Sequence, residues 1–295
     1  METTLTLPQQ IVETIGTFFS NFFASLDANI YLILDDIIFI NSDILNDSFI
    51  NNILGNSFTS GLLLLCNSLL LGFVIYYIIS LILSHLFLFN LQTPYQFIFK
   101  LIIISIIINN TYDICNFLLN LNSNISLVIR SIGEDIFNTE ICFSSLEKLI
   151  NPSFLNFSNN FNIFSINGFI KTFSSIGILN LILSYSLRYI MVKLFILLFP
   201  FAILSLLNKS TNYFFYSYIK SFISLLFSQS IVAFVLLIIF SLDFSNNNLF
   251  SQIIFIGAIY CLSRINYFMK ELMGGVSTTV YSNAQNLKSL FKGGY

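Results

Sequence analysis

Seven polar or charged side chains interrupt stretches of sequence that are otherwise strongly apolar. Polar groups at membrane depth are costly, so they usually mark a substrate path or the interior of a helix bundle. We expect these residues either to line a shared polar conduit or to hold a bundle together by interhelical hydrogen bonds. They are Asn109, Asn110, Asp113, Arg188, Lys193, Gln229 and Arg264.

Enzymatic chemistry is not expected from this set of residues. Their spacing matches no catalytic constellation, and the chain has no HExxH, GxSxG, Walker A or paired-carboxylate motif. One histidine and four cysteines without CxxC spacing give no pattern for a metal site. We therefore predict a non-catalytic protein that needs no cofactor and no metal.

The composition indicates an all-α integral membrane protein. Of the 295 residues, 56% are hydrophobic and only 9% are charged, whereas soluble domains are about 25% charged. A transmembrane helix needs about 20 apolar residues. Five such spans are predicted, or six if the third run holds two short spans: 61–91, 97–119, one within 169–207, 222–242 and 249–268.

Charge distribution orients the predicted spans. Residues 1–99 contain seven acidic residues and no Lys or Arg, and all twelve cations lie from Lys100 onward. Lys and Arg are retained on the cytoplasmic side of a membrane. We therefore expect a multi-pass protein of the cytoplasmic (inner) membrane, with its N-terminus outside and its C-terminus in the cytoplasm.

Three regions are predicted along the chain. Residues 1–60 form an acidic extracytoplasmic segment with an amphipathic helix, which lies on the membrane surface or packs against the spans. Residues 61–268 form the membrane domain, in which 120–170 is an extracytoplasmic loop containing short helices. Residues 269–295 form a cytoplasmic tail with an amphipathic helix that contacts lipid or a partner.

The third apolar run poses a problem of length and charge. A single helix over 172–207 would be about 54 Å long, against a hydrocarbon core of about 30 Å. We expect Pro200 to break this helix, which places Lys193 about 10 Å and Arg188 about 18 Å from the inner surface. Lys193 is expected to reach the interface. Arg188 needs a polar partner, and Gln229 lies at a depth from which it can meet either cation.

The order of these elements is similar to that of a known family. Arg188 is followed by PFAIL at 200–204, by the polar turn NKSTN at 208–212 and by SQSIVAF at 228–234. Upstream, residues 93–133 combine a Pro-aromatic entry, a Lys-bearing span and a polar exit. In these features, residues 61–268 resemble the TrbL family, the polytopic membrane subunits of conjugative type IV secretion systems.

The resemblance implies a non-catalytic subunit that helps DNA or protein cross the cytoplasmic membrane. Its implied partners are secretion ATPases, other membrane subunits, lipid, the transient substrate and further copies in an oligomer. The partner-facing cations would be Lys209, Lys220, Lys288 and Lys292. Two alternatives stay open on the sequence: a small-molecule transporter or ABC permease subunit, and a membrane assembly scaffold without a conduit.

Overall fold

The computed structural model describes residues 14–15, 17–18, 28–55, 60–87, 93–149, 166–208, 211–242 and 249–273, and its secondary structure within these ranges is entirely helical. Four helices are long and apolar enough to cross a membrane, namely α4, α9, α10 and α11, and the bent pair α5–α6 is a possible fifth span. The prediction of an all-helical chain with several membrane-length apolar helices is confirmed. The helices are α2 (Ala28–Ile38), η1 (Ser42–Asn46), α3 (Ser48–Leu54), α4 (Gly61–Phe87), α5 (Pro94–Asn109), α6 (Thr111–Phe137), α7 (Phe143–Leu149), α9 (Ile166–Leu204), η2 (Ser205–Leu207), α10 (Asn212–Phe240) and α11 (Leu249–Met273).

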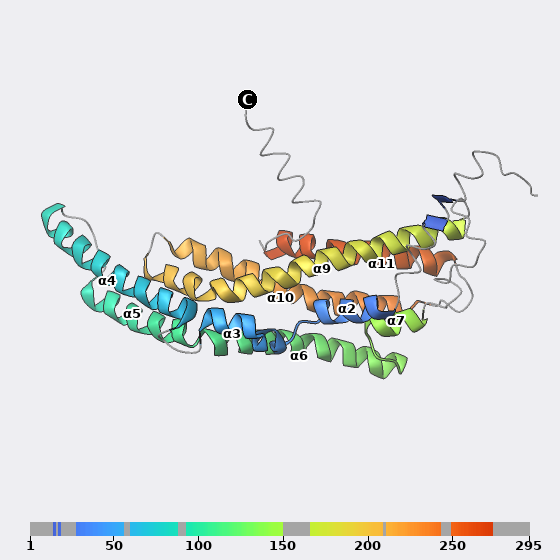
Figure 1. The fold of residues 1–295 in the computed structure, drawn as a ribbon, viewed down its shortest axis with the longest axis horizontal. Helices are drawn as coiled ribbons and strands as arrows, with labels where there is room; N and C mark the ends of the chain where they lie inside the picture. Colours follow the sequence, from blue (N-terminus) through green and yellow to red (C-terminus); the bar gives the residue numbers. More distant parts are fainter. Residues whose placement is uncertain are drawn as a thin grey trace, which may run out of the picture.

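The long helices lie side by side in an elongated bundle (Figure 1). Helices α9 and α10 are central, because α10 contacts α6, α9 and α11, and α9 also contacts α2, α4 and α5. Helices α4 and α5 lie at one end of the bundle and α7 lies at the other (Figure 1). Helix α10 is apolar around most of its circumference, which is the pattern of a helix surrounded by others or by lipid.

Two hydrophobic cores follow one another along the bundle. The first core joins α4, α5, the beginning of α6, residues 192–207 and residues 218–226. The second core joins α2, α7, α11, residues 170–185 of α9 and residues 232–240 of α10. Helices α9 and α10 therefore pass through both cores, and the change from one core to the other falls near the middle of each helix.

Helix α9 continues through Pro200, so the predicted helix break there is wrong. The helix runs unbroken to Leu204 and tightens into the 3-10 turn η2. A proline removes its own backbone donor and crowds the preceding turn, but Pro200 lies only one turn from the end of α9. Ala202 and Ile203 are buried in the first core, and this packing holds the last turn in place.

The second predicted span and the loop after it also differ from the structure. Helix α5 ends at Asn109, the chain bends by 65°, and α6 continues to Phe137. Residues 120–137 are thus helical and not a loop, because one face of α6 is buried at helical spacing, at residues 122, 126, 129 and 133. Helix α7 is one of the expected short helices, and residues 150–165 lie outside the described ranges.

The described part of the N-terminal segment belongs to the same body as the spans. Helix α2 packs on α7 and α9, and α3 packs on α4 and α9. Ile38, Leu45 and Ile50 are completely buried in the two cores. Most of the predicted N-terminal amphipathic helix and all of the predicted tail helix lie outside the described residues.

Candidate functional site: a buried polar layer

A layer of polar side chains separates the two hydrophobic cores. Along α9, Tyr185 belongs to the second core, Val192 belongs to the first, and Arg188 lies between them. Along α10 the same change occurs at Ser228 and Gln229, and α6 supplies its own buried polar side chains at this level. We call these residues the polar layer: Asn122, Ser126, Arg188, Ser228 and Gln229, all of them buried.

Arg188 is the centre of the polar layer and has no exposed surface. Its Nε donates to the carbonyl of Leu225 at 2.8 Å, and its Nη2 donates to the carbonyl of Leu226 at 3.5 Å. Its Nη1 donates to the carbonyl of Ile38, the last residue of α2, at 2.9 Å. One side chain of α9 thereby binds the backbone of α10 and the end of α2.

Backbone dipoles, and not a carboxylate, balance the Arg188 charge in the described part of the chain. The ion pairs found there are Arg130–Glu140 and Lys193–Asp47. The guanidinium also lies 5.9 Å from the ring centre of Tyr185, whose hydroxyl donates to the carbonyl of Leu262 on α11 at 3.0 Å. A buried charge is tolerated when several hydrogen bonds satisfy its donors. Arg188 and Tyr185 together connect α9 to three neighbouring helices.

Gln229 joins α10 to α6. Asn122 donates to its Oε1 at 3.1 Å, and its Nε2 donates to the hydroxyl of Ser126 at 2.9 Å. The expectation that Gln229 meets Arg188 or Lys193 is therefore wrong. Arg188 uses the backbone carbonyls one turn earlier in α10, and the Gln229 side chain points to the α6 side of the same helix.

Lys193 pairs with an acidic residue of the N-terminal segment. Its Nζ lies 2.6 Å from Oδ2 of Asp47 and 5.0 Å from the ring centre of Tyr189. Asp47 also caps α3 by accepting from the backbone N–H of Phe49 at 3.1 Å. The hydrogen bond from Lys193 lowers the pKa of Asp47 below its ordinary value of 3.8, and the Phe49 N–H adds to this effect.

Asp35 fixes the other end of the N-terminal segment. Its two carboxylate oxygens accept from the backbone N–H groups of Phe143 and Ser144 at 2.8 and 2.9 Å. Burial raises the pKa of Asp35 above 3.8, although these two backbone hydrogen bonds oppose the shift. The polar points that hold the segment to the bundle thus include Asp35, the carbonyl of Ile38, and Asp47.

The other predicted intramembrane residues lie away from the polar layer. Asn109 of α5 accepts from Asn67 of α4 at 3.2 Å. Asn110 lies at the bend between α5 and α6, and Asp113 is exposed in the first turn of α6. Arg264 is exposed on α11. The structure therefore brings Arg188 and Gln229 into one layer, places Lys193 nearby, and does not join the seven residues in a single path.

The predicted partner-facing cations are described only in part. Lys220 is exposed on α10. Lys209, Lys288 and Lys292 lie outside the described residues.

Sequence reasoning missed several members of this site. Asn122 and Ser126 are spaced four residues apart, which places them on one helical face, but the sequence predicts a loop from residue 120 onward. Asp35 and Asp47 belong to the predicted acidic segment 1–60, which the sequence does not connect to the polar residues of the spans. Asp47 lies 146 positions from Lys193, and no local pattern connects the two residues.

The chemistry of the polar layer is that of a structural cross-link. The hydrogen bonds of its side chains run between helices or to backbone carbonyls. No group of three or more His, Cys, Asp or Glu within the described ranges could hold a metal ion. Within the described ranges, Ser230, Gln252 and Asn266 have buried polar atoms that find no hydrogen-bond partner.

Comparison with known proteins identifies no relative. The chain matches no protein family model, no curated protein and no solved structure. Its function therefore has to be argued from the polar layer and from the surfaces of the bundle.

Proposed function

We propose that the protein is a non-catalytic, multi-pass subunit of a conjugative type IV secretion apparatus in the cytoplasmic membrane. The supporting observation is the polar layer, in which the central cation binds three backbone carbonyls from two neighbouring segments. Such a layer fixes the helices relative to one another. The helix bundle that this layer holds together, here called the frame, can then serve as a rigid scaffold for the assembly of other subunits.

Two polar residues on which the resemblance to the TrbL family rests support this proposal. Arg188 and Gln229, taken from the Arg-bearing span and from SQSIVAF, lie in the same buried layer and each makes contacts between helices. The apolar Pro-containing stretch and the polar turn lie between the Arg-bearing span and the Gln-bearing span. The two spans therefore run antiparallel, and their polar residues lie at one level.

The geometry of the polar layer favours a frame over a solute transporter. A transporter needs polar groups that face a substrate cavity near the middle of the membrane, often at broken helices. The 65° bend between α5 and α6 is a feature that would fit this class. At that bend, however, the Asn109 side chain is bonded to Asn67 and the Asn110 amide donates to the carbonyl of Ile106 at 2.7 Å.

The outer surfaces of the bundle are suited to lipid and to other subunits. Helix α4 is the least buried of the candidate spans and is apolar on all sides, so it requires lipid or another apolar helix around it. We propose an arrangement with the N-terminus outside and the C-terminus inside, in an oligomer with secretion ATPases and further membrane subunits. Lys220 and the lysines at 209, 288 and 292 would face the cytoplasmic partners, and DNA or protein would be the transient substrate.

An in-frame deletion in the native host tests this proposal. Conjugative DNA transfer should be lost while growth is normal, and the wild-type gene should restore transfer. Arg188→Leu should be inserted into the membrane at the wild-type level and should fail to restore transfer, because the N-terminal segment would lose its hydrogen bond from α9. Ile190→Ala, on the exposed side of the same helix, is the matched control and should restore transfer. Normal transfer in the deletion strain would refute the proposal.

A further inference from the structure

Helix α6 carries three asparagines in line on its outer surface. Asn116, Asn120 and Asn124 are spaced four residues apart, which aligns them along one side of a helix. We call them the asparagine strip. Asn124 is exposed, and the other two are partly buried. The strip lies apart from the face that α6 packs on the bundle, which is formed by the buried residues 122, 126, 129 and 133.

The asparagine strip borders a groove of about 650 Å³ between α6 and α10. Asn120 and Asn124 line the α6 wall of this groove, and Ser230 lies in its α10 wall. The Nδ2 of Asn120 donates to Oδ1 of Asn116 at 3.0 Å, and Asn124 forms no hydrogen bond within the described ranges. Ser230 is 1% exposed, and its hydroxyl finds no partner in the described part of the chain either. The described residues thus leave polar groups of the groove unsatisfied.

The groove lies near the middle of the membrane if α10 spans it. Helix α10 is a candidate span, and α6 packs beside it. Asn122 and Ser126 of α6 bind Gln229, which lies within one turn of the midpoint of α10. Asn120 and Asn124 are each two residues from Asn122, a rise of about 3 Å along the helix. They therefore lie at nearly the same depth as Gln229.

The exposed surface of α6 is divided between apolar and polar residues. Its exposed apolar side chains include Leu121, Ile125, Val128 and Ile132, which recur at helical spacing beside the asparagine strip. Helix α6 is long and apolar enough to cross a membrane only in combination with α5. Polar groups at membrane depth face the interior of a bundle or a water-filled cavity, because hydrocarbon offers them no hydrogen bonds. The apolar residues can therefore face lipid, whereas the asparagine strip requires a polar environment.

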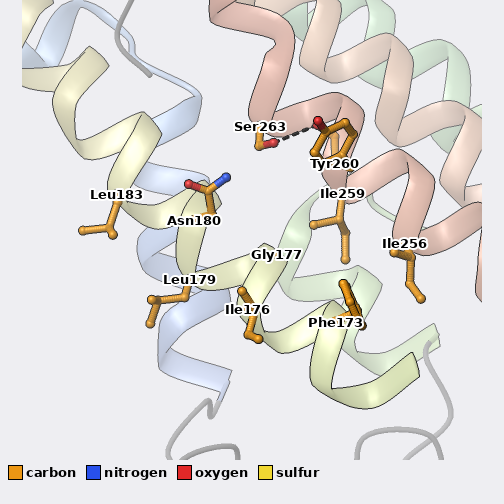
Figure 2. Close-up of a pocket in the computed structure, with 10 residues that line it drawn as sticks. All are labelled: Phe173, Ile176, Gly177, Leu179, Asn180, Leu183, Ile256, Ile259, Tyr260 and Ser263. Atoms are coloured by element: carbon orange, nitrogen blue, oxygen red, sulfur yellow. Dashed lines mark hydrogen bonds between the residues drawn. The ribbon is translucent and has the colours of Figure 1, made fainter. Parts of the chain in front are cut away.

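The groove between α9 and α11 does not make the same demand (Figure 2). Its volume is about 420 Å³, and most of the residues that line it are apolar. The Ser263 hydroxyl donates to the carbonyl of Tyr260 at 2.7 Å within α11. Asn180 precedes Arg188 of the polar layer by eight residues, about 12 Å along α9, so it lies nearer to the membrane surface. Lipid tails can fill this groove, which makes its apolar residue Leu183 a suitable control position.

We propose that the asparagine strip of α6 borders a water-filled path through the middle of the membrane. The amides of Asn120 and Asn124 bond to water in the groove, and the apolar residues beside them face lipid. Neighbouring subunits of the assembly close the path on its other side, and a hydrophilic substrate crosses along it. The path rests on the membrane placement in the proposed function and not on the secretion role, so it stands even if the substrate is a small solute.

Thiol accessibility in membranes of the native host tests this path. The native cysteines are replaced, and single cysteines are placed by Asn120→Cys, Asn124→Cys, Val128→Cys and Leu183→Cys. Val128 and Leu183 are matched controls, because they are 59% and 51% exposed on apolar surfaces. Membranes are opened by sonication in a cationic methanethiosulfonate, and the thiols left unreacted are counted after denaturation by a mass-tagged maleimide. Thr139→Cys, exposed beyond the end of α6, gives the rate in open water.

We expect the cysteines at 120 and 124 to react at least about tenfold faster than those at 128 and 183. The reactive species is the thiolate, and apolar surroundings raise the pKa of a thiol, each unit lowering the thiolate fraction about tenfold. Slow reaction at all four positions, with fast reaction at 139, would show that protein or lipid covers the strip and would overturn the path. Equally fast reaction at all four would place the exposed side of α6 in bulk water and would overturn it too. The labelling does not depend on DNA transfer, so this proposal and the proposed function can fail separately.

Discussion

Replacing Arg188 with leucine should release the N-terminal segment from the bundle without unfolding the bundle. The carbonyls of Leu225 and Leu226 lie inside α10 and keep the backbone hydrogen bonds of that helix when the guanidinium is lost. Ile38 ends α2, so its carbonyl has no partner of its own within the helix. The variant therefore leaves one buried acceptor without a donor, and that acceptor belongs to the N-terminal segment.

The size of this effect follows from the cost of an unsatisfied buried carbonyl. That cost is about 1–3 kcal/mol, and a tenfold change in an equilibrium corresponds to about 1.4 kcal/mol. Opening of the segment should thus become about five- to 150-fold more frequent. The packing of α9 on α10 should change little, because the carbonyls of Leu225 and Leu226 lie inside α10 and keep their helical hydrogen bonds.

Thiol labelling measures this opening directly. In a variant whose native cysteines are replaced, Leu34→Cys places a thiol on the completely buried face of α2. Its labelling rate should rise by the stated factor when Arg188→Leu is added. Ala233→Cys, completely buried on α10, should label at the same rate in both backgrounds. Equal labelling of Leu34→Cys in the two backgrounds would show that Arg188 does not hold the segment, and faster labelling of both thiols would show that it stabilises the whole bundle.

Two further predictions concern the other attachments of the bundle. Asp47→Asn should lower the thermal midpoint at neutral pH, because the pKa of Asp47 is lower in the folded protein than its ordinary value of 3.8. The stability that this lowered pKa contributes is present when the pH is above the ordinary pKa, and it is lost as the pH falls through the pKa of the folded protein. The difference from the wild type should therefore shrink below about pH 4, and a constant difference measured from neutral to acidic pH would contradict the Lys193–Asp47 pair. Gly133→Ala should destabilise the contact of α6 with α10 by about 1–3 kcal/mol, since a Cβ atom there collides with Leu237 and lies 2.7 Å from Cγ1 of Ile141. Gly72→Ala, which meets nothing within 4 Å on α4, is the control in a denaturation experiment, and an equal effect of both substitutions would argue against the close packing of α6.

Hydropathy was sufficient to predict the class of this protein and the approximate position of most apolar helices. It succeeded for α4, α10 and α11 because the need of about 20 apolar residues for a span is a local property of the chain. It failed at the ends of two elements. Pro200 does not end α9 because buried neighbours hold the last turn, and residues 120–137 form a helix because α10 covers one of its faces.

The partners of the polar residues were decided by the tertiary structure alone. The position of Arg188 within an apolar run indicates that it needs a polar partner. Its acceptors are backbone carbonyls, which every residue carries, so the sequence cannot show which of them bind it. Lys193 and Asp47 meet only because α3 packs against α9. Gln229 turns to Asn122 because α6 lies on that side of α10. A sequence shows which groups must be satisfied in an apolar environment, and the packing of helices distant along the chain determines which groups satisfy them.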